Sequence, residues 1–573
     1  MIPSVWMKVA TAACSCLPVV QQIMPVHLAA YSEVETTRVD HLALPPPSIE
    51  PELHSFAQMS GDESDSAPAN PDAQQPAENP VIAGDAPSMS EPTIPPSATD
   101  ARVQSLQQAL ARTYQTNPTL MARRAELRGL DNVVAFERAA GNPQISAGAT
   151  FGQDVYITRR LGARGRNLRT DADLSQVLFA GGRIRNATRS AQTRVIGGRA
   201  ELRATEGDIL TEAVAAYADV LRDREIRDLN QSQVSILMAN LESTRARFLV
   251  RDLTLADVAQ SEARLEVAKS NLATAEGRLQ ASEENFERIV GARAGDLEPL
   301  PSLPPLPLSS EQAAEAALAD NDDIAAFAAR ARAAGYDVAV SRSARLPTLS
   351  VVSTVDNFNA LGTADRASGV PVGTLPNSET NIVAGFSLRI PLYQGGAASA
   401  RVRQTEEIRS QFVEEAIAVE RLVVADARTA FSIWRNATNA ISFNELAVTS
   451  NENALESIKV EQTIGARSIL DVLNAEQELL SSKISLTSAR HDAYVAAFDL
   501  LNTMGAAQAA DLNIDAGPLY DPEVYYREYS DTWSDWNDGP RRSPASTRNV
   551  PAESDSPVTR LNNGTLEDID ADD

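Results

Sequence analysis

The stretch LRIPLYQGGAASARVRQ, residues 388–404, changes its residue pattern in the middle. Up to Tyr393, apolar residues occupy every second position, which is typical of a β-strand with one apolar face. After Gly395 and Gly396 the alternation stops, and neither glycine nor proline occurs again until Gly465. A run of this kind favours a helix. The sequence therefore predicts a strand that continues almost directly into a very long helix.

The same junction occurs twice in the chain. VLFAGG (177–182) matches PLYQGG (391–396), and Gly181 and Gly395 lie 214 positions apart (395 − 181). A period this long indicates one duplicated half-domain rather than an array of short repeats. Further pairs occur at this offset, and others upstream at an offset of 204 (347 − 143): Gly182 and Gly396, Asp257 and Asp471, Glu262 and Glu476, Asn117 and Asn321, Pro143 and Pro347.

Each half has the same expected order of elements. A first helix, at about 105–140 and again at about 311–345, is closed by Pro143 or Pro347, because proline cannot continue a helix. Two strands follow, and then a long helix, a short turn and a second helix. The long helix that begins at residue 397 would extend about 100 Å at 1.5 Å per residue, which is too long for a compact globular domain.

The four expected strands are each long enough to cross a membrane at a tilt, which takes about 9–11 residues. They are the segments 145–158, 171–180, 348–358 and 381–393. Four strands cannot close a barrel, and open sheet edges are not tolerated in lipid. The chain must therefore pair with copies of itself, or the membrane interpretation of these strands is wrong. Three copies of the chain would supply twelve strands.

Composition narrows the possible functions. A net charge of −26 argues against nucleic-acid binding, because phosphate contacts need clustered Lys and Arg. Phosphate-binding loops, nucleophile elbows and metal-ligand spacings do not occur in the sequence. The histidines and cysteines are few and lie mostly near the N-terminus: Cys14, Cys16, His27, His41, His54 and His491. We expect a protein that is not an enzyme and has no cofactor, metal site or nucleic-acid partner.

The chain divides into six expected segments. The apolar core around 9–20 predicts a signal peptide, and Pro-, Ser- and Asp-rich stretches predict disorder. Lipidation of Cys14 or Cys16 is left open. The segments are a signal peptide (1–30), a disordered arm (31–100), a first repeat (101–291), a Pro-rich linker (292–310), a second repeat (311–505) and a largely disordered acidic extension (506–573).

This plan resembles the TolC-like outer-membrane efflux proteins. The resemblance covers residues 101–510 and is carried by the two junctions, by NPTL (117–120), and by the paired segments FLVRDLTLADVAQSEARL (248–265) and QTIGARSILDVLNAEQEL (462–479). It implies a mainly α fold with a membrane β-barrel portion, built from two structural repeats. It also implies a homotrimer in contact with outer-membrane lipid. The three copies would form one twelve-stranded barrel in the outer membrane of a Gram-negative bacterium and an α-helical tunnel across the periplasm.

The resemblance also implies a function. The trimer would be the passive exit duct of an efflux pump or of a type I secretion system. Its partners would be a periplasmic adaptor protein and a proton-driven or ATP-driven inner-membrane transporter. The helices alone also allow a periplasmic or coiled-coil scaffold or adaptor protein without a barrel, but the four duplicated strands argue against that alternative.

In the family, the turn after the long helix forms a periplasmic gate. By position, Asp471 would supply a ring of three carboxylates, whose proximity would raise the pKa of each. A second acidic ring falls on Asn474, which is an amide here, so strong cation selectivity is not expected. Arg467 would pair with Asp257, and Gln462 takes the place of a gate tyrosine.

The gate aspartates also fit a purely structural role. Ser468 with Asp471, and Thr254 with Asp257, have the spacing of helix N-terminal capping pairs. Cap and gate are compatible for Asp471.

The two tip turns, Val250–Arg251 and Ile464–Gly465, are the expected adaptor-docking sites. Gly465 suits a left-handed turn, so Arg251 at the equivalent position should either adopt another turn or bear strain. The strand–helix junctions have a structural role only, and their residues are Pro143, Gly181, Gly182, Pro347, Gly395 and Gly396.

Overall fold

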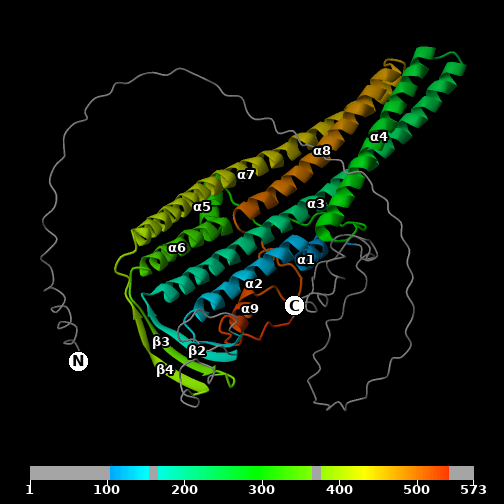
Figure 1. Cartoon of the computed structure of the whole chain (residues 1–573). Helices are drawn as coiled ribbons and strands as arrows, with labels where there is room; N and C mark the ends of the chain where they lie inside the picture. Colours follow the sequence, from blue (N-terminus) through cyan, green and yellow to red (C-terminus); the bar gives the residue numbers. More distant parts are fainter. Residues whose placement is uncertain (1–102, 154–165, 364–375, 541–573) are drawn as a thin grey trace, which may run out of the picture. The chain divides into compact units, whose positions relative to one another are not determined.

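The computed structural model describes residues 103–153, 166–363 and 376–540 (Figure 1). The predicted signal peptide (1–30), the arm (31–100) and the end of the acidic extension (541–573) lie outside the described residues. Each half of the rest contains two short helices, two strands, a long helix and a further helix, in that order. The duplication predicted from the sequence is thus a duplication of secondary structure.

The first repeat comprises α1 (Leu106–Thr116), α2 (Pro118–Ala139), β1 (Gln144–Gln153), β2 (Arg166–Ala180), α3 (Arg183–Leu249) and α4 (Leu255–Val290). The second comprises α5 (Ser310–Asp320), α6 (Asp322–Ser343), β3 (Thr348–Asn359), β4 (Ser378–Arg389), α7 (Ala397–Thr463) and α8 (Ile469–Thr503). A last helix, α9 (Pro522–Tyr529), follows. The two long helices, α3 and α7, each have 67 residues, so each extends about 100 Å.

The first helix of each repeat is not continuous, which corrects the prediction of single helices at 105–140 and 311–345. Asn117 has extended backbone angles, and its side chain accepts hydrogen bonds from the N–H groups of Thr119 and Leu120. Asn321 does the same at the start of α6. An asparagine side chain competes with the helix for backbone donors, so each asparagine ends one helix and caps the next.

The four strands form one antiparallel sheet in the order β1-β2-β3-β4. β4 ends at Arg389, although the alternation predicted a strand up to residue 393. The early end agrees with Pro391, which cannot donate a ladder hydrogen bond. The last residues of the predicted first strand, 154–158, lie outside the described residues.

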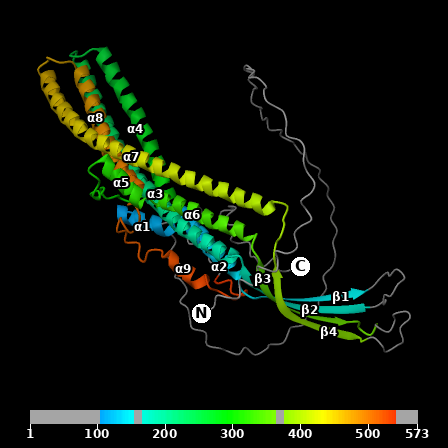
Figure 2. The same cartoon turned by 90° about the vertical axis from the view of Figure 1, so that its left-hand side faces the viewer.

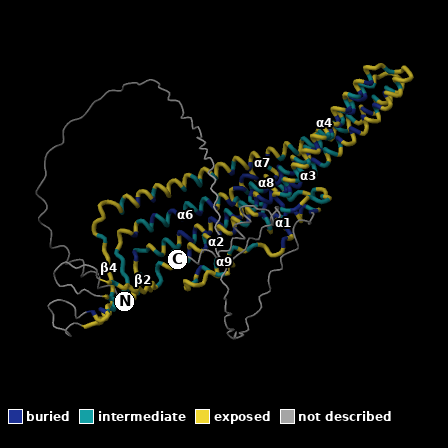
Figure 3. Tube along the Cα trace, turned by 45° about the vertical axis from the view of Figure 1, so that its right-hand side comes forward, coloured by how far each residue is buried: buried dark blue, intermediate teal, exposed yellow. Residues whose placement is uncertain are grey.

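The register gives the sheet two different faces. Ile382 lies opposite Val355 and Phe386 opposite Val351, while Ile145 lies opposite Leu174 in the first hairpin. All six side chains share one face, and the exposed fraction reaches 75% for Phe386 and 78% for Ile145. The other face is mostly polar and carries Thr150, Asp171, Asp173, Thr354, Asp356 and Arg389. The edge strands β1 and β4 are largely exposed, and β2 and β3 are exposed or intermediate at nearly every position (Figure 3).

The helices form two long hairpins. α3 packs along α4, and α7 packs along α8, with α3 also contacting α2, α6 and α8. In Figure 2 both hairpin tips lie at the end of the helices away from the sheet. The largest core cluster is centred on Tyr217, Phe286, Leu210 and Leu500. Among the described helices, none is long and apolar enough to cross a membrane.

The first part of the C-terminal extension is ordered, so the prediction of a largely disordered segment is wrong for residues 506–540. Ala507, Ile514 and Ala516 are buried in the main core. The backbone N–H of Tyr520 donates to the hydroxyl of Tyr114 at 2.9 Å, and α9 packs against α2. The segment is acidic overall, so its few apolar residues did not predict order. They are buried because helices far away in the sequence provide the surface against which they pack.

Candidate functional site

The two hairpin tips have the same turn. The N–H of Asp252 donates to the carbonyl of Arg247, and the N–H of Ala466 to that of Glu461, both at 2.9 Å. Arg251 has φ 59° and Gly465 has φ 79°. Of the two outcomes expected for Arg251, the structure therefore shows the strained left-handed turn. A left-handed residue other than glycine costs about 1–3 kcal/mol.

The gate aspartates cap the helices that follow the tips. Asp471 Oδ2 accepts hydrogen bonds from the N–H and the hydroxyl of Ser468 at 3.0 and 2.9 Å. Asp257 Oδ2 accepts the equivalent bonds from Thr254 at 2.8 and 2.7 Å. Hydrogen bonds from these hydroxyls and N–H groups lower the pKa of both aspartates. The capping interpretation is confirmed.

Arg467 contacts a different acid from the one expected. Its Nε donates to Glu461 Oε2 at 2.8 Å, and this hydrogen bond raises the pKa of Arg467. Asp257 contacts Thr254 instead of Arg467. Glu461 is only six positions before Arg467 and lies on the other side of the same tip turn, so the two side chains meet locally.

The other two predicted gate positions lie close to the tip. Asn474 Oδ1 accepts a hydrogen bond from Arg264 Nη2 at 2.8 Å, which links α8 of the second repeat to α4 of the first. The backbone carbonyl of Gln462 accepts from the N–H of Gly465 at 3.0 Å and so belongs to the tip turn.

A buried carboxylate near the tip was missed as a functional candidate. Glu476 accepts from Asn240 Nδ2 at 2.9 Å and lies 3.2 Å from Lys459 Nζ, so it joins α8 to both α3 and α7. The first repeat has the matching pair, Arg245 and Glu262. The offset of 214 residues relates the two pairs (476 − 262, 459 − 245). It had already matched Glu262 with Glu476, and applying it to Arg245 and Lys459 as well would have shown that each glutamate has a basic partner.

The tip turns carry exposed apolar side chains. Leu249, Val250, Leu255 and Ile464 are all exposed. Beside them, α7 and α8 enclose a groove of about 410 Å³, lined by Leu455, Val460, Thr463, Leu479 and three charged residues. The tips thus present apolar surface at the positions expected to dock another protein.

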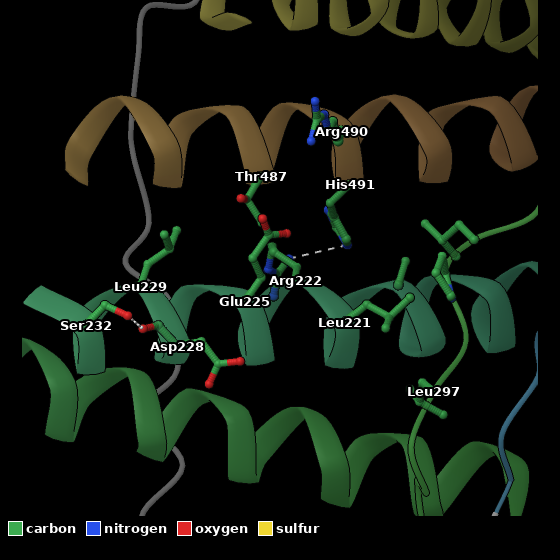
Figure 4. Close-up of a pocket in the computed structure, with 13 residues that line it drawn as sticks. Leu221, Arg222, Glu225, Asp228, Leu229, Ser232, Leu297, Thr487, Arg490 and His491 are labelled. Carbon is green, nitrogen blue, oxygen red and sulfur yellow. Dashed lines mark hydrogen bonds between the residues drawn. The ribbon is translucent and has the colours of Figure 1, made fainter. Parts of the chain in front are cut away.

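A larger pocket of about 560 Å³ lies between α3, α8 and the linker residues 297–300 (Figure 4). His491 projects into it from α8 and lies 2.9 Å from both Asp219 and Asp492. Burial alone would lower the pKa of His491, but its hydrogen bonds with these aspartates outweigh burial and raise it. Across the residues that the structure describes, no acidic, His or Cys side chains are grouped so as to hold a metal ion.

The strand–helix junctions have equivalent backbones in both repeats. Gly181 and Gly395 have φ 59° and 60°, and Gly182 and Gly396 both have φ 83°. A Cβ atom on Gly181 would lie only 2.6 Å from the side chain of Leu346. Pro143 and Pro347 each lie one residue before the first strand of their repeat. These positions redirect the chain between sheet and helices.

Comparisons with known proteins agree with this architecture. The family model described as outer membrane efflux protein matches residues 106–292 and 313–506. The outer membrane efflux protein BepC of Brucella suis biovar 1 is 31% identical over 436 residues, which cover 75% of this chain and 91% of BepC. The outer membrane protein TolC of Escherichia coli is 22% identical over 72% of this chain and 84% of TolC.

A solved structure of CusC shares the fold. It matches with a TM-score of 0.61 at 15% identity and covers 73% of this chain and 98% of CusC. The family match spans most of both repeats, and BepC covers most of the chain above 30% identity. This chain therefore belongs to the outer membrane efflux protein family, as the two strand–helix junctions had indicated, and is an outer-membrane channel protein that extends into the periplasm.

Proposed function

We propose that three copies of this chain join through the edges of their sheets to form a twelve-stranded barrel above an α-helical tunnel. The observation that carries the proposal is the exposed apolar face that runs across all four strands. Soluble monomers rarely expose a continuous apolar face that crosses a whole sheet. The edge strands β1 and β4 also have unpaired backbone groups along one side, which lipid would not tolerate. A closed barrel in lipid satisfies both constraints, because lipid covers the apolar face and pairing β1 of one copy with β4 of the next completes the edges.

The duct is passive, and its energy comes from partners. The apolar tip residues Val250 and Ile464 are exposed and would dock a periplasmic adaptor beside Arg251 and Gly465. An inner-membrane transporter, driven by protons or by ATP, would load the tunnel. A periplasmic adaptor or coiled-coil scaffold would leave the apolar face of the sheet exposed to water. A membrane channel would place this face in lipid, so we favour the channel.

The gate in this proposal is the ring of three Asp471 carboxylates at the tip. In the single chain, hydrogen bonds with Ser468 keep the pKa of Asp471 low. Bringing three copies together on one axis would oppose this effect, because each carboxylate disfavours the charge of the others. The ring therefore titrates at higher pH than the capped aspartate alone.

Conductance in planar lipid bilayers tests both parts of the proposal. The purified full-length chain should form channels whose conductance changes with pH and with divalent cations, and Asp471→Asn should weaken both responses. Asn474→Asp adds the second ring and should increase block by divalent cations. Asp257→Asn, on the equivalent cap of the first repeat, is the matched control. Identical responses from the parent and Asp471→Asn would refute the ring, whereas an absence of channels would refute the duct.

A further inference from the structure

Two tryptophans near the end of the described chain are largely exposed. The exposed fraction is 73% for Trp533 and 95% for Trp536. Of the other two tryptophans in the sequence, Trp6 lies outside the described residues, and Trp434 packs beside Phe431 against the main core. Large aromatic side chains dominate cores and interfaces, so a largely exposed pair of tryptophans indicates a surface that contacts another molecule.

The segment that carries the pair is held firmly in place. Arg138 Nη1 donates to the backbone carbonyl of Ser530 at 3.1 Å, and Arg138 also forms an ion pair with Asp531. The loop then returns to α9, where Gly539 lies beside the ring of Tyr529. The loop that carries the tryptophans is therefore attached near both of its ends.

The helix before the loop, α9, is itself attached to the helices of the first repeat. Tyr525 on α9 bonds to Asn132 on α2 at 3.0 Å, and Glu523 pairs with Arg199 on α3 at 3.1 Å. α9 is thereby attached to two helices of the first repeat before the loop begins.

This loop lies at the level where the helices meet the sheet. Its anchor, Arg138, is in the last turn of α2, and β1 begins at Gln144. Because Gln144 is only six residues after Arg138, the start of β1 lies within about 20 Å of this anchor. In Figure 2, α9 runs beside α2 toward the base of the sheet. The tryptophans are therefore carried close to the boundary at which a membrane-inserted sheet would leave the lipid.

We propose that Trp533 and Trp536 insert into the headgroup region of the inner leaflet and form an interfacial anchor for the channel. Tryptophan is enriched at membrane–water interfaces, because its ring is apolar and its indole N–H needs a polar partner. Asp535 and Asp538 are exposed beside the pair and would be repelled by anionic lipids. The lipid recognised is thus a zwitterionic phospholipid. The proposal rests on insertion of the sheet into the membrane.

Lipid quenching of tryptophan fluorescence tests the anchor. Two full-length variants are reconstituted into phosphatidylcholine vesicles: Trp6→Phe with Trp434→Phe, which leaves the exposed pair, and Trp6→Phe with Trp533→Phe and Trp536→Phe, which leaves Trp434. Phospholipids brominated near the headgroup end of their acyl chains should quench the first variant at least about two-fold more than the second, because interfacial rings lie at that depth. Adding anionic phosphatidylglycerol should not increase the difference.

Two results would overturn the anchor. If both variants were quenched equally by brominated lipid and acrylamide also quenched the first variant, Trp533 and Trp536 would lie in water. Protection from both bromine and acrylamide would place it against a second copy of the chain. Conductance is measured on the same vesicles. Normal conductance without quenching therefore rejects the anchor alone, whereas loss of flotation with the vesicles rejects membrane insertion of the sheet.

Discussion

At the scale of single residues, Asp131 on α2 is the least satisfied charged group of the described chain. It is only 2% exposed, and neither carboxylate oxygen has a hydrogen-bond partner. Burial raises its pKa to about 6, against a smaller opposing effect of Arg199 and Arg128. Arg199 is held instead by Glu523 of α9, so ordering the C-terminal segment keeps this cation from pairing fully with Asp131.

We expect Asp131→Asn to stabilise the protein by about 1–2 kcal/mol at pH 7 and by much less at pH 4. The folded state holds the Asp131 proton more tightly than the unfolded chain. Stability of the parent should therefore rise as pH falls from about 7 toward 4, and the variant should lose this part of the dependence. Urea unfolding at both pH values measures the difference. Glu126→Gln, at an exposed position of the same helix, is the control. A variant that is less stable than the parent at pH 7 would contradict the prediction.

The two tips allow a second prediction at this scale. Arg251→Gly should stabilise its turn by about 1 kcal/mol, because glycine adopts positive φ without a steric cost. The gain is smaller than the full strain, because glycine loses more conformational entropy on folding. Gly465→Ala should do the reverse. A Cβ at Gly465 would meet no atom within 4 Å, so its effect reports backbone conformation alone. Hydrogen exchange of the tip amides should slow in the first variant and accelerate in the second; the same direction in both would refute the strain.

At the scale of elements, contacts between α3 and α8 join the two repeats within one chain. His491 of α8 lies between Asp219 of α3 and Asp492. The charged groups that face it are Asp219, Arg222 and Asp492, and Glu225 and Arg490 line the same pocket. Because its pKa is raised in the folded state, the protonated ring strengthens this contact.

The contact should therefore weaken as pH rises. Its contribution is complete below about pH 6.5, the ordinary histidine value, and is lost as pH rises through the raised pKa of the folded state. His491→Gln should flatten the slope of Tm against pH above about pH 6.5, the ordinary histidine value. Arg490→Gln, on the same turn of α8, changes the charge without removing the titrating ring. An unchanged slope in His491→Gln would show that the ring does not link the helices.

Sequence patterns predict elements best where the signal is local. The strand–helix junction at 388–404 and its copy follow from alternation and paired glycines alone. The breaks at Asn117 and Asn321 were missed because an asparagine within a helical pattern signals a cap only when its side chain turns back onto the following N–H groups. Of the predicted gate residues, the capping role of Asp471 followed from spacing. The partner of Arg467 did not, because both Glu461 and Asp257 are chemically suitable.

At the scale of the whole molecule, several features of the described chain fit the proposed trimer. The sheet exposes an apolar face and two unpaired edges, and the tips expose apolar turns. The ordered C-terminal segment could not be predicted from its composition, because its few apolar residues are buried only by helices far away in sequence. One chain thus contains the parts of the duct but not its closed form.

A cryo-electron microscopy map of the full-length protein, extracted from outer membranes, tests the trimeric duct most directly. We expect three copies around one axis and twelve strands in a closed barrel, with β1 of each copy paired to β4 of the next. The apolar face that holds Ile382 and Phe386 should point to the detergent belt. A different number of copies, an open four-stranded sheet, or a barrel with these side chains in its lumen would contradict the proposed duct.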